Sequence, residues 1–189
     1  MTDADFLTRM LFEFSYWHAM NDEPFKPQAY QLASESVNAL GHEVKEAWAK
    51  GGVKALEDLP GIGQSIAEKM DEYFRTGKVK AYADLKKKFP VDIWGLTRIE
   101  GMGPKHIRDL YAQVKIKNIG DLEAAIKAHK IKDLPHFGEK SEEKLAHGIA
   151  LLKSSSGRHL RYQFGLPCGS CEAGQGAAHR HGAKCGPCL

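Results

Sequence analysis

The stretch Leu59-Pro60-Gly61-Ile62-Gly63-Gln64-Ser65-Ile66-Ala67-Glu68-Lys69 gives the strongest indication of how this chain folds. Two glycines separated by one apolar residue predict a tight turn, because glycine adopts backbone conformations that other residues avoid. The residues that follow predict an amphipathic helix. The start of such a helix presents free N–H groups and the positive end of its dipole, so we expect the segment to hold a phosphate. Taken alone, the turn also fits a plain connection between two helices.

The same pattern returns further along the chain, as internal repeats do. Residues 96 to 105 read Leu96-Thr97-Arg98-Ile99-Glu100-Gly101-Met102-Gly103-Pro104-Lys105, and the spacing from Gly61 to Gly101 is 40 residues. A third copy reads Leu134-Pro135-His136-Phe137-Gly138, with His136 in place of the first glycine. The third turn is therefore expected to be a structural hairpin, whereas the first two predict contacts with the phosphate backbone of a nucleic acid, independent of base sequence.

Length and charge limit the possible classes of protein. The 189 residues suffice for one ordinary domain or two small ones, and the net charge of +3 is too small to indicate nucleic-acid binding by itself. Residues 1–60 carry five Lys and Arg against ten Asp and Glu, whereas residues 61–115 carry eleven against seven. Positive charge thus gathers where the two intact turns lie, although Lys86-Lys87-Lys88 also fits a solvated helix face.

The periodicity of apolar residues predicts an all-α fold without a sheet. We expect two small helical units, residues 1–90 and 91–157, each with a helix-hairpin-helix, and a Cys-rich tail at 158–189. No long apolar run or signal peptide is evident, which predicts a soluble, cytoplasmic protein. The expected helices cover residues 4–19, 26–40, 43–50, 64–75, 82–88, 92–96, 104–112, 121–128 and 139–153.

On the stretches Glu23 to Tyr30, Leu56 to Lys78 and Leu96 to Lys105, the chain resembles the N-terminal region of family X DNA polymerases, especially the bacterial ones. The resemblance covers about residues 5–158. It implies a lyase-type domain that grips the 5′ phosphate of gapped or nicked DNA, and a fingers-type domain that tracks the primer strand. It also implies a role in DNA repair near the bacterial nucleoid. The magnesium ligands of the palm and the metal phosphoesterase domain have no counterpart, so we expect no polymerase activity from these residues.

The resemblance also assigns roles to single residues. It places the Schiff-base lysine of a 5′-deoxyribose-phosphate lyase at Lys69 and the phosphate pocket at Lys26 and Tyr30, although a surface ion pair for Lys69 and a packing role for Tyr30 stay open. Family lysines are replaced by Glu57, Ser65 and Ala81. The residues expected to contact DNA are Lys26, Tyr30, Gly61, Gly63, Ser65, Gly101, Gly103 and Lys105. The carbonyls expected to hold a sodium or potassium ion belong to Leu59, Ile62 and Gly63 in the first turn, and to Ile99, Met102 and Gly103 in the second.

The tail holds every cysteine of the chain. Cys168, Cys171, Cys185 and Cys188 form two Cys-x-x-Cys pairs, which predict a structural zinc site, with His179 or His181 as substitute ligands. The tail has almost no apolar residue to pack around a metal, and its Gly, Ala, Arg, Pro, His and Cys content also fits a GC-rich gene read out of frame. A zinc-bearing tail that docks a protein partner is therefore one alternative, and an accidental tail is the other.

Overall fold

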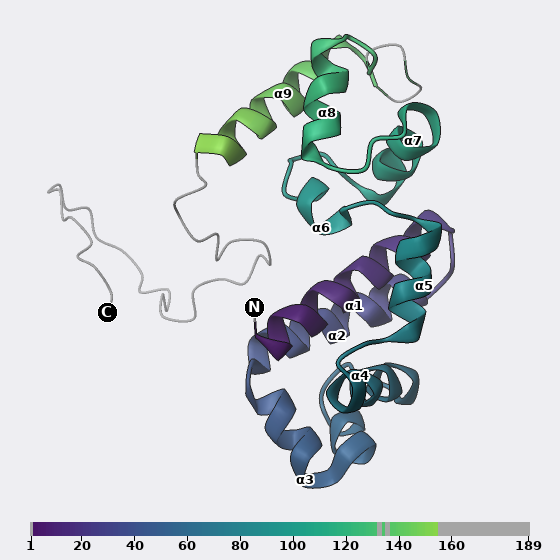
Figure 1. Ribbon diagram of the computed structural model, residues 1–189, viewed down its shortest axis with the longest axis vertical. Coiled ribbons are helices and arrows are strands. Elements are labelled where there is room, and N and C mark those ends of the chain that lie inside the picture. Colours follow the sequence, from purple (N-terminus) through teal and green to yellow (C-terminus); the bar gives the residue numbers. More distant parts are fainter. Residues whose placement is uncertain (1, 132–133, 135–136, 155–189) are drawn as a thin grey trace, which may run out of the picture.

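The computed structural model describes residues 2–131, 134 and 137–154, and every regular element in these residues is a helix (Figure 1). The all-α prediction is confirmed for this part of the chain. The zinc ligands Cys168, Cys171, Cys185 and Cys188 lie outside the described residues, so the zinc site and the tail's protein partner stay predictions. The helices are α1 (Asp3–Met20), α2 (Lys26–Leu40), α3 (Glu43–Glu57), α4 (Gln64–Thr76), α5 (Lys80–Lys88), α6 (Ile93–Leu96), α7 (Pro104–Val114), α8 (Ile119–Lys127) and α9 (Glu139–Ser154).

The helices lie where the sequence predicts them, apart from shifts of one or two residues and one larger difference in α3. The expected helix at 43–50 extends to Glu57. Gly52 has φ 61° and ψ −138°, so the helix kinks there and resumes instead of ending. The resumed segment buries Leu56 completely and leads into the first glycine turn. It therefore forms the first helix of the hairpin. No helix directly before this turn was predicted from the sequence.

The first hydrophobic core lies among α1 to α5. Helices α1 and α2 run side by side, and α3 and α4 pack at one end of the pair (Figure 1). A capping box starts α1, in which the Thr2 hydroxyl accepts from the Asp5 amide and the Asp5 carboxylate accepts from the Thr2 amide. The core side chains include Leu7, Met10, Leu11, Phe14, Tyr30, Ala33, Val37, Val44, Leu56, Ile62, Ile66, Ala67, Met70 and Leu85.

The second core lies among α6 to α9, and α1 contributes to it as well. Met20 is buried in this cluster and Phe12 packs against it, meeting the Trp94 ring edge-on at a centroid distance of 5.1 Å. Leu85 belongs to the first cluster and Val91 to the second, close to the boundary expected near residues 90–95. Because α1 serves both cores, the division into units 1–90 and 91–157 stays a prediction. No described helix is long and apolar enough to cross a membrane.

A buried carboxylate ties α1 to α5 and to the start of α6. Glu13 is fully buried and accepts hydrogen bonds from Arg9 at 3.1 Å and from the Tyr82 hydroxyl at 2.8 Å, and it also pairs with Lys86. Arg9 reaches on to Asp92 at 2.8 Å, the residue that caps α6. Burial, and then the neighbouring Glu13 charge, raises the pKa of the Tyr82 hydroxyl. The network therefore fixes the segment that connects the two cores.

Candidate nucleic-acid interface

The first two glycine turns share one backbone geometry. Gly61 has φ 75° and Gly101 has φ 86°, in the left-handed region that favours glycine. In the first turn the Ile62 amide donates to the Leu59 carbonyl at 3.2 Å. In the second, the Met102 amide donates to the Ile99 carbonyl at the same distance of 3.2 Å. The side chains between the glycines, Ile62 and Met102, are buried and anchor the turns.

Each of these turns opens a helix whose start has no side-chain cap. Gly63 begins α4 with φ −91° and ψ 168°, and Gly103 begins α7 with φ −84° and ψ 172°. No described side chain accepts from the first amides of either helix, whereas Asp92 and Asn118 cap α6 and α8. A Cβ placed at Gly63 or Gly103 would meet no described atom within 4 Å. The two starts therefore combine uncapped amides with an open approach, which is the arrangement that binds anions.

The third turn keeps much of this backbone pattern. The Phe137 amide donates to the Leu134 carbonyl at 3.0 Å, and the Glu142 amide donates to the Gly138 carbonyl at 3.0 Å. In the first turn, Ala67 donates to Gly63 in the same way at 2.9 Å. His136 lies outside the described residues. A purely structural role for this turn therefore stays a prediction.

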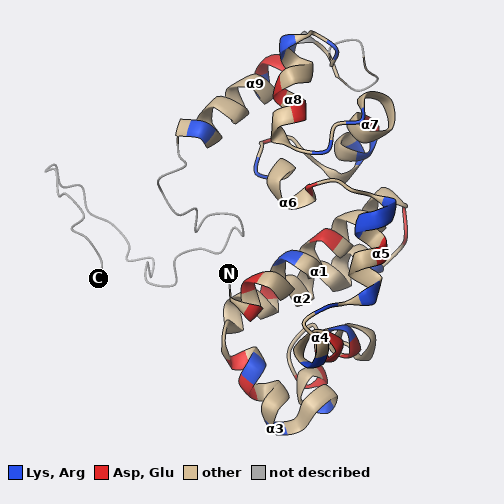
Figure 2. Cartoon of the chain, viewed as in Figure 1, with Lys and Arg blue, Asp and Glu red and all other residues tan. Residues whose placement is uncertain are grey.

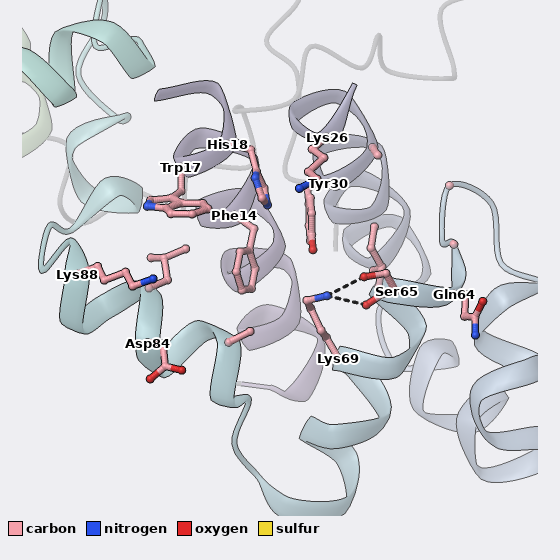
Figure 3. Close-up of a pocket in the computed structure, with 16 residues that line it drawn as sticks. Phe14, Trp17, His18, Lys26, Tyr30, Gln64, Ser65, Lys69, Asp84 and Lys88 are labelled. Carbon is pink, nitrogen blue, oxygen red and sulfur yellow. Dashed lines mark hydrogen bonds between the residues drawn. The ribbon is translucent and has the colours of Figure 1, made fainter. Parts of the chain in front are cut away.

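A cavity of about 710 Å³ lies beside the first turn, with walls from α1, α2, α4 and α5 (Figure 3). It brings together six residues expected at the phosphate site: Lys26, Tyr30, Gly61, Gly63, Ser65 and Lys69. Aromatic rings form one wall, in which Tyr30 stacks on Phe14 at 5.2 Å and on His18 at 5.1 Å. The remaining expected contacts, Gly101, Gly103 and Lys105, belong to the second turn and do not line this cavity.

Lys69 points its amine into this cavity. The Nζ atom donates to the Ser65 carbonyl at 2.8 Å and to the Ser65 hydroxyl at 2.9 Å, and it lies 5.9 Å from the centre of the Tyr30 ring (Figure 3). The alternative of a surface ion pair is not what the described residues show, because the partner of Lys69 is Ser65 rather than an acid. Tyr30 is only 7% exposed, so it packs in the core and lines the cavity at the same time.

Lys26 is held by an acid at the mouth of the cavity. Its Nζ lies 2.7 Å from Glu23, and the Nδ1 of His18 lies 3.0 Å from the other Glu23 oxygen without hydrogen-bond geometry. Lys26 first, and then His18, hold the pKa of the Glu23 carboxyl below its usual range. Glu23 in turn raises the pKa of Lys26. An incoming phosphate therefore has to compete with Glu23 for the Lys26 ammonium group.

Several residues of the cavity were not expected from the sequence. His18 and Trp17 come from α1, and Asp84 and Lys88 come from α5. Phe14, Trp17 and His18 stand three and four residues apart, and this spacing places them on one helix face. The Lys-rich end of α5 is visible as a blue segment in Figure 2. Charge and helical spacing were the sequence signals that could have pointed to these residues. They do not show which face of α1 or α5 meets the glycine turn.

The turn carbonyls are arranged in a way that suits a monovalent cation. Among the described residues, no hydrogen bond reaches the carbonyls of Ile62 and Met102, and those of Leu59 and Ile99 each accept one turn amide. The Gly63 carbonyl accepts two helix amides, from Ile66 and Ala67 at 2.9 Å each, and the Gly103 carbonyl accepts one, from Ile107 at 3.1 Å. A carbonyl oxygen has two lone pairs, so Leu59, Ile62, Ile99, Met102 and Gly103 each keep at least one for sodium or potassium, whereas both of those of Gly63 are taken.

Each of the two glycine turns lies in a segment that matches a known protein family. Residues 4–79 match the helix-hairpin-helix domain family, and residues 95–149 match the SAM-like helix-hairpin-helix tandem family. The DNA polymerase/3′-5′ exonuclease PolX of Bacillus subtilis is 28% identical over 134 residues, which is 71% of this chain. The chain spans 22% of the length of that relative. Two segments of the chain therefore match helix-hairpin-helix families, and the chain is similar to a family X DNA polymerase over 134 residues.

Proposed function

We propose that the chain binds the backbone of DNA without sequence preference, at gaps, nicks or 5′-phosphorylated ends, as part of DNA repair. The observation that carries the proposal is the pair of uncapped glycine turns at Gly63 and Gly103, one of which borders a cavity with Lys26 and Lys69. Backbone amides and lysines recognise phosphates and carry no base information. The homology to a DNA polymerase supports DNA as the partner.

The cavity supports the proposed preference for a broken strand. In a continuous duplex each phosphate is flanked by two sugars, and the strand passes over the protein surface. A strand end can place its terminal phosphate inside the cavity, where Lys69 and the start of α4 converge. A terminal phosphate also carries more negative charge than a phosphodiester, which strengthens its contacts with cationic groups.

The test is a set of fluorescence anisotropy titrations with four DNAs of one sequence: intact duplex, nicked duplex, and one-nucleotide gaps with a 5′ phosphate or a 5′ hydroxyl. We expect the phosphorylated gap to bind tightest and every affinity to fall linearly with the logarithm of salt concentration. Equal affinity for the intact duplex and the phosphorylated gap would overturn the preference for broken DNA. An affinity independent of salt would overturn backbone binding altogether.

A second candidate function, 5′-deoxyribose-phosphate lyase activity, is favoured by the position of Lys69. In this reaction a deprotonated lysine amine attacks the C1′ aldehyde carbon, water leaves, and an imine forms. The amine of Lys69 faces the cavity and donates to one residue, Ser65, so its attack requires those two hydrogen bonds to be given up. The walls then hold the sugar phosphate, with Tyr30 beneath the amine.

Borohydride trapping tests the lyase. The reagent delivers hydride to the imine carbon and leaves a stable amine between protein and DNA. We expect a covalent adduct on DNA with a 5′-deoxyribose phosphate, and none with the Lys69→Ala variant. The matched control is Lys78→Ala, which changes an exposed lysine outside the cavity. Absence of any adduct with the unchanged protein, or an undiminished adduct with Lys69→Ala, would reject this function.

A sodium or potassium ion at the turn carbonyls would add a positive charge next to the DNA backbone. The carbonyls expected to hold it are those of Leu59, Ile62 and Gly63 and those of Ile99, Met102 and Gly103, and Gly63 would have to release one of its two helix amides. Replacing potassium by tetramethylammonium at equal ionic strength is then expected to weaken DNA binding by about threefold. Equal affinity in the two salts would show that no small cation takes part.

A further inference from the structure

One edge of α5 faces the cavity and carries a lysine to which neither the sequence nor the resemblance assigns a role. Ala81, Asp84, Leu85 and Lys88 line the cavity, and their spacing of three, four and seven residues places them on one helix face. Ala81 is too short to reach a ligand, and Leu85 is buried in the core. Lys88 is therefore the one cation that the described part of α5 offers to the cavity.

The two neighbouring lysines are used elsewhere. Lys86 pairs with the buried Glu13 and donates to the Val91 carbonyl at 3.0 Å. Lys87 lies 3.5 Å from Asp84 and does not line the cavity. Lys88 has no ion pair or hydrogen bond with the described residues and is exposed. Of the three consecutive lysines, Lys88 is the one whose amine is available for a ligand.

Lys26 lies near Tyr30, and Lys88 lies on the far side of Trp17 and Phe14 from it (Figure 3). The rings of Phe14, His18 and Trp17 form the wall of the cavity between the two lysines (Figure 3). One phosphate beside Lys26 leaves the Lys88 end of the cavity without an anion. A DNA strand end carries a second phosphate, on the 3′ side of its first sugar. The cavity thus has a cation at each end and an apolar wall between them, which matches two successive phosphates and the nucleoside that joins them.

We propose that Lys88 binds the first internucleotide phosphate of the strand whose 5′ phosphate lies beside Lys26. The proposal rests on the proposed function, since it takes a 5′-phosphorylated strand end as the ligand. Asp84 shares the helix face with Lys88 and repels the same phosphate. Neutralising Asp84 is therefore expected to strengthen DNA binding, whereas removing the Lys88 amine is expected to weaken it.

The experiment uses the full chain, the phosphorylated one-nucleotide gap, and the same gap with an uncharged methylphosphonate at the first internucleotide position. We expect Lys88→Ala to weaken binding of the charged gap by about threefold to tenfold and to lower the salt slope by about one. Lys87→Ala, the matched control, is expected to change the affinity less than twofold. Asp84→Asn is expected to tighten binding about twofold.

The methylphosphonate identifies which phosphate Lys88 contacts. It is expected to weaken binding of the unchanged protein but to have no further effect on Lys88→Ala, because each change removes the same pair. Additive losses would overturn the assignment of Lys88 to that phosphate, and equal losses in Lys88→Ala and Lys87→Ala would overturn any specific contact. If the unchanged protein binds the intact duplex as tightly as the phosphorylated gap, the proposed function fails instead. Thermal melts of each variant verify that the fold is kept.

Discussion

The first and second glycine turns have the same backbone and different surroundings. With an offset of 40 residues, Lys69 of α4 corresponds to Asp109 of α7, and Ser65 corresponds to Lys105. Asp109 pairs with the neighbouring Arg108 at 3.6 Å, whereas Lys69 faces a cavity. The two turns thus share the backbone that we propose holds a phosphate. What a turn does beyond binding depends on the helices that pack beside it.

Neighbouring helices account for the difference between the turns. The first turn has α1, α2 and α5 around it, and they leave a cavity lined by rings and lysines. Beside the second turn, α7 packs against the C-terminal part of α1, and Arg108 donates to the Met20 carbonyl at 2.8 Å. Arg108 is therefore committed to joining the two cores. We expect the second turn to act as an anchor on the strand and the first to receive the strand end.

The largest expected effect concerns chemistry at the first turn. Lys69→Ala is expected to abolish borohydride trapping, because no other described lysine corresponds to it in position. Asp109→Lys supplies a lysine at the matching position of the second turn but no cavity. We expect no trapping from the double variant Lys69→Ala, Asp109→Lys, as measured by adducts on denaturing gels. An adduct formed by this double variant would show that the cavity is dispensable.

The next effect tests what the two turns have in common. Gly63→Ala and Gly103→Ala each place a methyl group in open space at a φ that alanine tolerates, so the fold is expected to survive. The methyl group should block the phosphate, and loss of hydrogen bonds to a charged group is expected to weaken DNA binding by about tenfold at each site. Anisotropy titrations measure this loss.

Gly138→Ala is the matched control for both variants, because a Cβ there also meets nothing within 4 Å in the described structure. We expect its affinity for DNA to be unchanged, since the third turn has His136 in place of a glycine. A tenfold loss in Gly138→Ala would mean that the third turn binds phosphate as the first two do. All three turns would then bind phosphate to a similar extent.

A smaller effect is expected when the residues at the corresponding positions are exchanged. Ser65→Lys adds a cation beside the first turn, and Lys105→Ser removes one beside the second. We expect the first change to tighten binding of the phosphorylated gap by about threefold and the second to weaken every DNA by a similar factor. The salt slope should rise by about one and fall by about one, respectively. If Ser65→Lys and Lys105→Ser changed the salt slope in the same direction, backbone contact at these positions would be contradicted.

The smallest effect depends on pH. Lys26 and His18 hold the pKa of Glu23 below its usual range, so the folded protein gains stability from Glu23 above its ordinary pKa and loses it as the pH falls through the lowered value. Glu23→Gln removes this contribution. Between about pH 7 and pH 3, the thermal midpoint of the unchanged protein should fall more than that of Glu23→Gln.

Other carboxylates with a lowered pKa are the same in both proteins and cancel in this comparison: Asp3, Asp71 and Glu123. Glu23→Gln also frees Lys26 at neutral pH, so it should bind the phosphorylated gap about twofold more tightly. Parallel melting curves at every pH would mean that the contact between Glu23 and Lys26 is lost in solution.

The glycine turns and most helices could be predicted because their causes are local. Gly61 and Gly101 determine the turns by their φ angles, and apolar spacing fixes the helix faces. The continuation of α3 to Glu57 was missed, since Gly51-Gly52 reads as a stop and only the burial of Leu56 shows why the helix resumes. At this point the packing of Leu56 in the core outweighs the tendency of the two glycines to end the helix.

The cavity could be predicted only in part. The resemblance pointed to Lys26, Tyr30 and Lys69, and the structure places all three around one space. His18 and Lys88 could not be assigned in this way, because they come from α1 and α5. Which faces of those helices meet the first turn is set by tertiary packing, which a repeat pattern within one segment does not encode.

Helix α1 supplies side chains to both hydrophobic cores, through Leu7 and Leu11 on one side and Met20 on the other. The covalent link between the cores, at residues 89–92, is therefore not what holds them together. A protease cut in this segment would leave two fragments that copurify and still bind DNA as a unit. The packing of α1 in both cores would then also keep the two glycine turns at a fixed separation.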